Sequence, residues 1–204
     1  MARGRFITFE GIDGAGKTTQ IEALQKLLVS HGIEVVRTRE PGGTPLGEKI
    51  RALLLSDAMT PRTETLLFFA ARAEHAETLI RPALEAGKWV ISDRFTDATY
   101  AYQTGGKGMP GAEVEALERW TLGGFAPDRT ILFDIAPEAA AARIARGRTD
   151  RDRFEKESLA FFGRVRRAYL ERAERDPERF LVVDAEASPD AIGRLIAGEF
   201  EKWL

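Results

Sequence analysis

A glycine-rich segment near the start of the chain, Gly11–Thr18 (GIDGAGKT), has the composition of a phosphate-binding loop. It fits the pattern G-x-x-x-x-G-K-[ST] and stands between a short apolar run and an amphipathic segment. Its glycines let backbone N–H groups turn toward phosphate oxygens, and the N-terminus of the following helix adds partial positive charge. We expect these residues to bind the phosphates of a nucleoside triphosphate: Gly11, Ile12, Asp13, Gly14, Ala15, Gly16, Lys17, Thr18 and Thr19.

Two side chains of this loop have separate expected tasks. Lys17 should reach the β- and γ-phosphates, and the hydroxyl of Thr18 is a ligand for Mg²⁺. Three aspartates directly follow apolar runs and are candidates for a carboxylate on the metal side: Asp93, Asp134 and Asp184. We favour Asp93 because Arg94 next to it places a guanidinium for a phosphate at the same strand end, whereas the other two are also typical of strand-end or capping positions.

An arginine cluster is the second unusual feature of the sequence. Five arginines fall within eleven residues: Arg143, Arg146, Arg148, Arg151 and Arg153. Guanidinium groups packed this densely repel one another unless anions bind them. One interpretation is a lid, at about 143–153, that closes over the triphosphate, excludes water and stabilises the transferring phosphoryl group. The alternative is a solvated charged surface that Asp150, Asp152 and Glu155 partly neutralise.

Length and composition exclude several classes of protein. The 204 residues favour one domain with insertions. The absence of cysteine excludes disulfides and zinc–thiolate sites, and two histidines make a histidine metal site improbable. A net charge of −2 argues against a general nucleic-acid binder. No apolar run approaches the roughly 18 residues of a membrane span, and the N-terminus does not resemble a secretory signal, so we expect a cytoplasmic protein.

The candidate residues need elements to position them, and the chain alternates short and long apolar patterns. Five short runs predict strands over 5–10, 34–38, 89–92, 130–135 and 180–183. Helical periodicity or capping residues predict helices over 17–30, 46–55, 63–86, 114–122 and 154–175, and others opening at 137 and 188. Strands separated by helices indicate a parallel sheet covered on both faces. Ligands bind such sheets beyond the carboxyl ends of the strands, where the residues singled out above are found.

Four motifs taken together are much more specific than a phosphate loop alone: Phe9–Thr19 (FEGIDGAGKTT), Thr38–Thr44 (TREPGGT), Asp93–Phe95 (DRF) and Ala101–Gln103 (AYQ). With them the chain resembles the thymidylate kinases, of the bacterial type, over essentially its whole length. The resemblance implies an α/β fold of three layers, the P-loop NTPase fold, with a five-stranded parallel sheet in a single kinase domain.

The same resemblance implies an activity and partners. The family transfers the γ-phosphoryl group of ATP, with Mg²⁺, to thymidine monophosphate, giving the diphosphate needed for DNA precursors. It is usually a homodimer, and its dimer helices are expected to include the 63–86 stretch. Neither a nucleic acid nor a membrane is an expected partner.

The resemblance also assigns roles at the acceptor site. Asp13 matches an acid that contacts the 3′-hydroxyl of the acceptor and helps organise the metal region. Phe68 and Arg72 match a pair in which a ring stacks on thymine and a guanidinium bonds its carbonyl, and their spacing places both on one helical face. Tyr102 matches a ring that crowds the 2′ position of the sugar. The remaining acceptor positions are Arg51 and Arg94 for the phosphate, and Glu40, Pro41, Thr99 and Gln103.

One position divides this family into two classes. Some members carry an arginine within the phosphate loop, whereas others have glycine there and supply the catalytic arginine from the lid. Gly14 and the arginine cluster resemble the second class. Arg148 aligns best with the catalytic lid position, with Arg146 and Arg153 as competitors that would bind ATP. The implied catalytic residues are Lys17, Arg94, Arg148 and Asp13, while Phe95 departs from the tyrosine common after the Asp-Arg pair.

Two other functions compete with this interpretation. A deoxynucleoside kinase would need a carboxylate base beside the acceptor hydroxyl, and Glu10 or Glu40 could be imagined there. Arg94 and Arg51 instead favour an acceptor that already carries a phosphate. A nucleotide-dependent switch or ATPase would need a sensor loop or a guanine motif, and the chain has no Asn-Lys-x-Asp.

Overall fold

The computed structural model describes residues 3–147, 154 and 157–204. Five parallel strands form one sheet in the order β2-β3-β1-β4-β5. Their bounds are β1 (Phe6–Glu10), β2 (Val35–Arg39), β3 (Trp89–Asp93), β4 (Arg129–Asp134) and β5 (Phe180–Asp184). The predicted five-stranded parallel sheet is confirmed, and each expected run forms a strand within one residue or so of its predicted ends.

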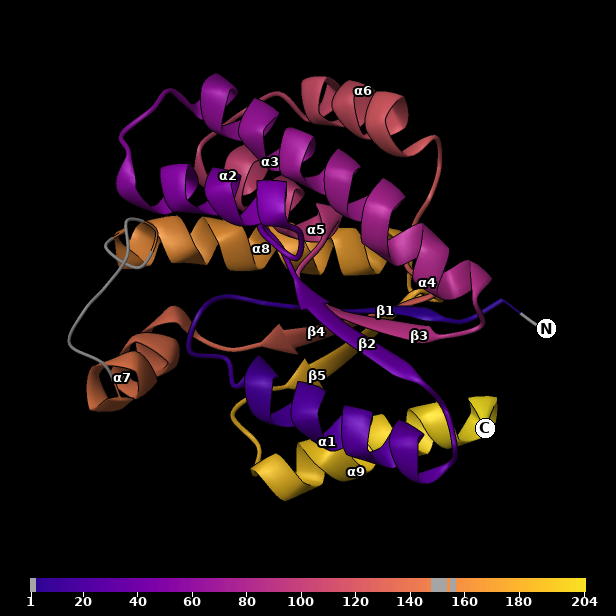
Figure 1. The fold of residues 1–204 in the computed structure, drawn as a ribbon. Coiled ribbons are helices and arrows are strands. Elements are labelled where there is room, and N and C mark those ends of the chain that lie inside the picture. Colours follow the sequence, from indigo (N-terminus) through magenta and orange to yellow (C-terminus); the bar gives the residue numbers. More distant parts are fainter. Residues whose placement is uncertain (1–2, 148–153, 155–156) are drawn as a thin grey trace.

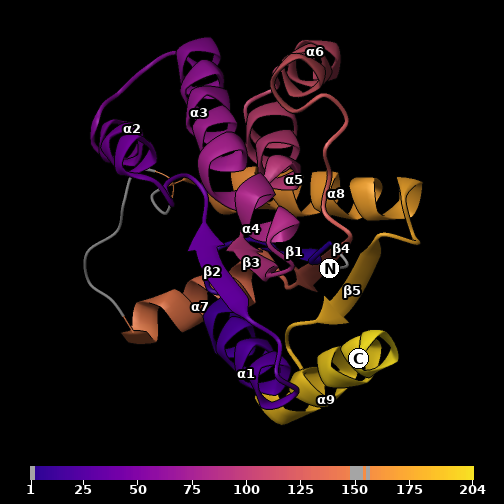
Figure 2. The ribbon, with the colours of Figure 1, turned by 45° about the vertical axis from the view of Figure 1, so that its right-hand side comes forward.

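Helices cover both faces of the sheet and make the outer two layers (Figure 1). One face carries α1 (Lys17–Ser30) and α9 (Pro189–Phe200), which pack against each other (Figure 2). The other face carries α8 (Leu159–Arg175) together with the helices that follow β2 and β3: α2 (Pro45–Ser56), α3 (Pro61–His75), α4 (Arg81–Glu85), α5 (Thr96–Thr99) and α6 (Gly111–Leu122). Finally, α7 (Pro137–Gly147) lies beyond the carboxyl ends of the strands (Figure 1).

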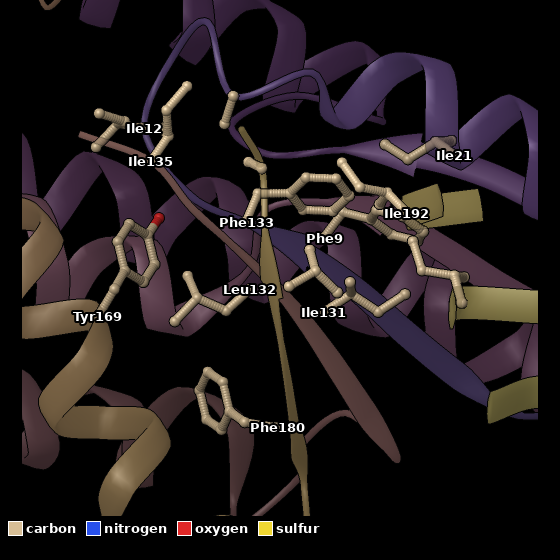
Figure 3. Close-up of a cluster of buried hydrophobic side chains, with 14 of the residues drawn as sticks. Phe9, Ile12, Ile21, Ile131, Leu132, Phe133, Ile135, Tyr169, Phe180 and Ile192 are labelled. Atoms are coloured by element: carbon tan, nitrogen blue, oxygen red, sulfur yellow. The ribbon is translucent and has the colours of Figure 1, made fainter. Parts of the chain in front are cut away.

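The core is built from the alternation of side chains along the central strands. Phe9 and Phe133 stack with ring centroids 5.8 Å apart between the sheet and the α1–α9 layer. Leu132, one residue earlier in β4, points to the opposite face, toward Tyr169 and Phe180 (Figure 3). All five residues of β1 are buried, as expected for a central parallel strand covered on both faces. This rigid centre fixes where the strand ends lie.

The long helical stretch predicted over 63–86 is continuous but not uniform. Thr60 caps α3 by accepting a bond from the Thr63 N–H, and Pro61 occupies the first turn. A π-helical turn, η1 (Ala76–Ile80), then joins α3 to α4. The wide turn directly precedes Pro82, which lacks an N–H and would crowd the carbonyl one turn earlier in a regular helix. Pro82 therefore perturbs the helix without ending it.

One expectation about helices was wrong, and one helical segment was not predicted. The helix predicted from Phe154 begins instead at Leu159, because the hydroxyl of Ser158 accepts a bond from the Phe161 N–H and caps it. The segment after β3 was not predicted to be helical, yet it forms α5 and a second π-helix, η2 (Tyr100–Gly106). Among the described residues, no helix has both the length and the apolar character needed to cross a membrane. The chain ends in a 3₁₀ turn, η3 (Glu201–Trp203).

We predict that Ile131→Ala lowers the free energy of unfolding by about 2–5 kcal/mol, because Ile131 is fully buried at the centre of the sheet. Val182→Ala on the edge strand β5, where the side chain is half-exposed, is the matched control and should cost less than about 1 kcal/mol. Urea denaturation followed by circular dichroism measures both. Equal losses would contradict this placement of the core.

Candidate active site

The loop between β1 and α1 has the backbone shape that the glycine pattern predicts. Gly11, Gly14 and Gly16 have φ angles of 134°, 82° and 89°, all in the left-handed region that favours glycine. Gly16 is the N-cap of α1, and no side chain caps the helix there. The N–H groups of the first turn therefore remain without a side-chain partner and suit a phosphate.

Close packing explains why position 14 is glycine. A Cβ atom on Gly14 would lie 2.6 Å from the backbone oxygen of Ala140 and 3.0 Å from Ile144 in α7. Any larger side chain at position 14 would therefore displace α7. The same helix brings Arg143 near Gly16, where its guanidinium donates to the backbone oxygen of Ala185 at 2.8 Å. The loop and α7 consequently form one side of the site.

Lys17 is held at the floor of the loop. Its Nζ donates to the backbone oxygens of Gly11 at 3.2 Å and Ile12 at 3.4 Å, and lies 4.0 Å from Asp93 Oδ1. Burial lowers the pKa of Lys17, as does the neighbouring positive charge of Arg94, while Asp93 opposes this. The ammonium group is thus held beside the loop, where an anion would replace its weak contacts with carbonyls.

The structure distinguishes the three aspartates at the strand ends. Both oxygens of Asp134 accept bonds from Arg166, at 2.6 and 2.9 Å, and Asp184 accepts from the Glu186 N–H. In contrast, Asp93 Oδ1 is buried without a hydrogen-bond partner. A buried carboxylate oxygen with no partner is costly unless a ligand occupies it. Of the three, Asp93 is therefore best suited to contact a metal ion that is bound to the nucleotide phosphates.

Thr18 is exposed at the start of α1, on the same side of the loop. A hydroxyl and one carboxylate are a typical protein contribution to a Mg²⁺ site whose other ligands are phosphates and water. No cluster of three or more histidine, cysteine or acidic groups that could hold a metal occurs among residues 3–147, 154 and 157–204. The residues present fit a metal bound together with a nucleotide.

A cavity of about 600 Å³, counted with its open mouth, lies next to the phosphate loop on the α3 side of the sheet. Every predicted acceptor-site residue lines it: Asp13, Glu40, Pro41, Arg51, Phe68, Arg72, Arg94, Thr99, Tyr102 and Gln103. Asp13 belongs to both the loop and the cavity, so the two sites share a wall. Residues from five separate segments of the chain are brought together here.

Arg94 occupies the junction between the loop and the cavity. Its φ of 74° is in the left-handed region, which is unusual for a residue with a side chain. The Arg94 N–H donates to Phe9 O at 2.9 Å, and its carbonyl accepts from the Ser92 hydroxyl at 2.7 Å. Its guanidinium donates to Asp13 Oδ1 at 2.8 Å and to the Tyr102 hydroxyl at 3.1 Å.

These contacts also set the charge of Asp13. Burial raises its pKa, but the positive charges of Arg94 and Lys17 outweigh burial and hold the pKa below its usual range. Asp13 therefore stays ionised near neutral pH. A carboxylate fixed beside Arg94 keeps the guanidinium oriented before any anion arrives.

Glu10, the last residue of β1, anchors the segment that follows Arg94. One of its oxygens accepts from the Phe95 N–H at 2.7 Å, and the other accepts from the Tyr169 hydroxyl at 2.8 Å. Burial, together with the negative charge of Asp97, raises the pKa of Glu10 to about 8. Glu10 is enclosed on all sides and is no candidate for a general base.

Arg72 and Thr99 bring unpartnered polar atoms to the cavity. Arg72 is buried, with Nε bonded to Glu40 at 2.7 Å and Nη2 bonded to the Phe95 carbonyl at 3.1 Å. Its Nη1 has no partner, and neither has Thr99 Oγ1. Buried polar groups are nearly always paired, so these two atoms are suited to bond a polar ligand in the cavity.

The π-helix η2 presents two further side chains to the cavity, Tyr102 and Gln103. Gln103 Nε2 donates to Glu64 Oε1 at 2.8 Å, and Lys107 donates to both oxygens of Glu64. One N–H of the amide is thus engaged by Glu64, and the amide oxygen of Gln103 can accept a bond from a ligand. π-Helical turns occur often at functional sites.

Phe154 is a cavity residue that sequence reasoning missed. Its ring packs 6.1 Å from that of Phe68 and 6.3 Å from that of Tyr102, centroid to centroid. In the sequence it resembled the first apolar residue of a helix. Its position as a lone aromatic directly after the arginine cluster was the available sign of a different role. Leu55 and Ala98 also line the cavity and were not predicted.

Only part of the arginine cluster can be placed. Arg143 and Arg146 lie in α7. Arg148, Arg151 and Arg153, with most of the proposed lid at 143–153, fall outside the described residues. The catalytic role expected for Arg148 and the ATP contacts expected for Arg146 and Arg153 therefore stay predictions.

Comparison with known proteins identifies the family. The family model for thymidylate kinase matches residues 9–196. The chain belongs to the thymidylate kinase family. It is 57% identical over 200 residues to a thymidylate kinase of Burkholderia vietnamiensis, covering 96% of this chain and 97% of that one. It is 56% identical to a thymidylate kinase of Methylobacillus flagellatus, with 93% of each chain covered.

A solved structure supports the same assignment. The crystal structure of thymidylate kinase from Ehrlichia chaffeensis is similar with a TM-score of 0.74 and 36% identity, covering 89% of this chain and 93% of that one. Members of this family are kinases that use ATP, and the predicted P-loop kinase fold is confirmed. The cavity beside the phosphate loop is therefore the place to seek the phosphoryl acceptor.

We predict that Glu10 makes the stability of the protein pH-dependent. Its pKa is about 8 in the folded chain, against an ordinary value of 4.5, so the folded state holds the proton more tightly. The resulting stabilisation is complete below about pH 4.5 and is lost as the pH rises through 8. Between pH 5 and 8, wild type should lose roughly 3–4 kcal/mol of unfolding free energy that Glu10→Gln retains.

Urea titrations at pH 5 and pH 8 measure this difference. Glu34→Gln, which changes a carboxylate that is 74% exposed, is the control and should track wild type. Parallel profiles for wild type and Glu10→Gln would show that Glu10 does not titrate in this range.

Proposed function

We propose that this chain transfers the γ-phosphoryl group of ATP to thymidine monophosphate, with ATP on the phosphate loop and the acceptor in the adjoining cavity. The observation that carries the residue assignment is the junction of the two sites, where Arg94 bonds to both Asp13 of the loop and Tyr102 of the cavity. A guanidinium at this point can contact the phosphate of an acceptor that lies in line with the nucleotide.

On the donor side, the loop N–H groups and Lys17 bind the triphosphate. Thr18 and Asp93 are the groups that would hold Mg²⁺, which would offset the negative charge of the donor phosphates. Arg143 and Arg146 approach the nucleotide from α7. By resemblance to the family, Arg148 and Arg153 complete the donor side, with Arg148 on the transferring phosphoryl group.

On the acceptor side, Arg94 and Arg51 bind the phosphate of thymidine monophosphate. Phe68 stacks on the thymine ring, and Arg72 Nη1 donates to a ring carbonyl. The other contacts are an N–H of the ring to the amide oxygen of Gln103, a polar contact with Thr99, and crowding of the sugar 2′ position by Tyr102. The unpartnered atoms of Arg72 and Thr99 support this arrangement, because a pyrimidine with carbonyl groups would satisfy them.

The chemistry needs no general base. A phosphate monoester is already an anionic nucleophile at neutral pH, so the protein must align two anions and reduce their repulsion. Lys17 neutralises charge on the donor phosphates, while Arg94, fixed by Asp13, does so on the acceptor. We also propose that the protein acts in the cytoplasm.

A coupled assay of ADP formation with one acceptor at a time tests this function. We predict strong turnover with thymidine monophosphate and little with the uridine, cytidine, adenosine or guanosine monophosphates. Turnover with free thymidine would indicate a nucleoside kinase. ADP release without any acceptor would indicate an ATPase, and the acceptor-site assignments would be wrong.

Two substitutions separate the donor and acceptor roles. We predict that Arg94→Ala chiefly raises KM for thymidine monophosphate, by about tenfold or more, because it removes a contact with the acceptor phosphate. Lys17→Ala should chiefly lower kcat, by roughly 10²–10³, because it removes charge stabilisation at the transferring group. Initial rates at varied concentrations of each substrate measure both, and an unchanged acceptor KM in Arg94→Ala would contradict the assignment.

We also propose that the protein forms a homodimer through α3 and α6. Trp120 is 83% exposed and Leu66 is 51% exposed, and both line an apolar groove with Met109, Ala116 and Leu117. A large exposed apolar patch on a soluble chain is typical of a protein contact. The family resemblance supports a second copy of this chain as its occupant.

Sedimentation velocity tests this contact at micromolar concentration. We predict a dimer for wild type and a monomer for Trp120→Glu, since a buried unpaired charge at an interface is costly. Val29→Glu, on an exposed apolar side chain of α1, is the matched control and should remain dimeric. A monomeric wild type would refute the proposal.

A further inference from the structure

A series of four hydrogen-bonded side chains, one half-buried (Thr38) and three buried, leads from the sheet to the acceptor cavity. It begins at Thr38 in β2, continues through His75 at the end of α3 and Glu40 after β2, and ends at Arg72. Thr38 Oγ1 lies 2.7 Å from His75 Nε2, His75 Nδ1 lies 2.9 Å from Glu40 Oε1, and Arg72 Nε lies 2.7 Å from Glu40 Oε2. None of these contacts is used by the chemistry described above.

Both carboxylate oxygens of Glu40 already have a partner within the protein. Glu40 lines the cavity, but His75 takes one carboxylate oxygen and Arg72 takes the other. An ionised carboxylate only accepts hydrogen bonds, so His75 Nδ1 carries the proton. In the neutral ring, Nε2 then accepts the hydroxyl hydrogen of Thr38. With this tautomer, both hydrogen bonds donate in the same direction, from Thr38 to His75 and from His75 to Glu40.

The histidine ring has little freedom to move. His75 is fully buried, and a Cβ atom on Gly43 would lie 2.5 Å from both His75 Nε2 and Thr38 Oγ1. The loop after β2 therefore closes against the Thr38–His75 pair, and only glycine fits there. A ring held this tightly fixes the rotation of the Glu40 carboxylate, which in turn fixes Arg72.

The consequence appears at Arg72, the last of the four hydrogen-bonded side chains. Two nitrogens of Arg72 are held by Glu40 and by the carbonyl of Phe95, and the third, Nη1, is the unpartnered atom at the cavity. A guanidinium held at two corners presents its remaining N–H groups in one direction. A rotation of Glu40 would turn those donors away from the acceptor base.

We infer that His75, backed by Thr38, is a positioning residue for base selection: it orients Glu40, which holds Arg72 with Nη1 toward a carbonyl oxygen of the acceptor base. This inference rests on the proposed function. The same donor cannot bond the exocyclic amine that cytosine carries in place of a thymine carbonyl, so accurate placement of Arg72 favours thymidine monophosphate over deoxycytidine monophosphate.

Substitutions that keep or remove the Nδ1 donor test the inference. In His75→Asn the amide nitrogen can occupy the place of Nδ1 and donate to Glu40, whereas in His75→Leu it cannot. The readout is the ratio of kcat/KM for thymidine monophosphate to kcat/KM for deoxycytidine monophosphate, with KM for ATP as an internal check. We expect the ratio to fall about tenfold or more in His75→Leu and less than about threefold in His75→Asn.

Thr38→Val is the second variant, for the case that His75→Leu does not fold. It removes the hydroxyl behind the ring, leaves the His75–Glu40 contact possible, and should lower the same ratio by about threefold with KM for ATP unchanged.

Each outcome decides between a positioning role and a purely structural one. A structural role would lower stability and both kcat/KM values together, so an unchanged ratio in the variants that fold would overturn the inference. An equal fall in His75→Asn and His75→Leu would also overturn it. If wild type forms no ADP with thymidine monophosphate, the proposed function itself fails, which is a separate result.

Discussion

The active site depends on one backbone constraint, the left-handed conformation of Arg94 directly after β3. A residue with a side chain adopts this conformation only when its surroundings enforce it. Here the N–H is bound by Phe9 in the neighbouring strand, the carbonyl by Ser92, and the next N–H by Glu10. The turn sends the guanidinium toward the phosphate loop, and it leads the chain into the helices that carry the cavity residues. Without it, the loop and the cavity would not share Arg94.

Buried carboxylates provide most of the support around this turn. Glu10 holds Phe95 and Tyr169, while Asp97 accepts from Arg172 and Arg179, which ties the start of the cavity helices to α8 and β5. The ionised carboxylate of Asp97 adds little net stability while it is paired, but removing one of its partners leaves an unpaired charge and costs about 3–5 kcal/mol. The arrangement is therefore rigid. Phosphoryl transfer benefits from this rigidity, since it relies on fixed charges and alignment.

The periodicity of apolar residues predicted the sheet and α1, and the glycine pattern predicted the phosphate loop, because both report on local backbone and chemistry. The ten expected acceptor-site residues all line the cavity, but several of them, such as Phe68 and Arg72, lie outside the four motifs and were named only through the resemblance to a family. The sequence could not predict η2, whose wide turns follow from packing on α8, or Phe154, which reaches the cavity through tertiary contacts. Periodicity alone could not show which of Asp93, Asp134 and Asp184 is the carboxylate on the metal side. In the structure Asp134 is bonded to Arg166, whereas Asp93 Oδ1 has no hydrogen-bond partner. The contact between His75 and Glu40 could not be predicted either, because the two residues are 35 positions apart in the sequence.

The central claim is that one loop and one cavity align ATP with the phosphate of a thymidine nucleotide. The most direct measurement is ³¹P NMR of wild-type protein with Mg-ATP and thymidine monophosphate. The account predicts that ADP and thymidine diphosphate appear in equal amounts, with the new phosphorus joined to the acceptor phosphate through an anhydride bond. Inorganic phosphate as the main product, or a phosphate ester on a sugar hydroxyl, would contradict it.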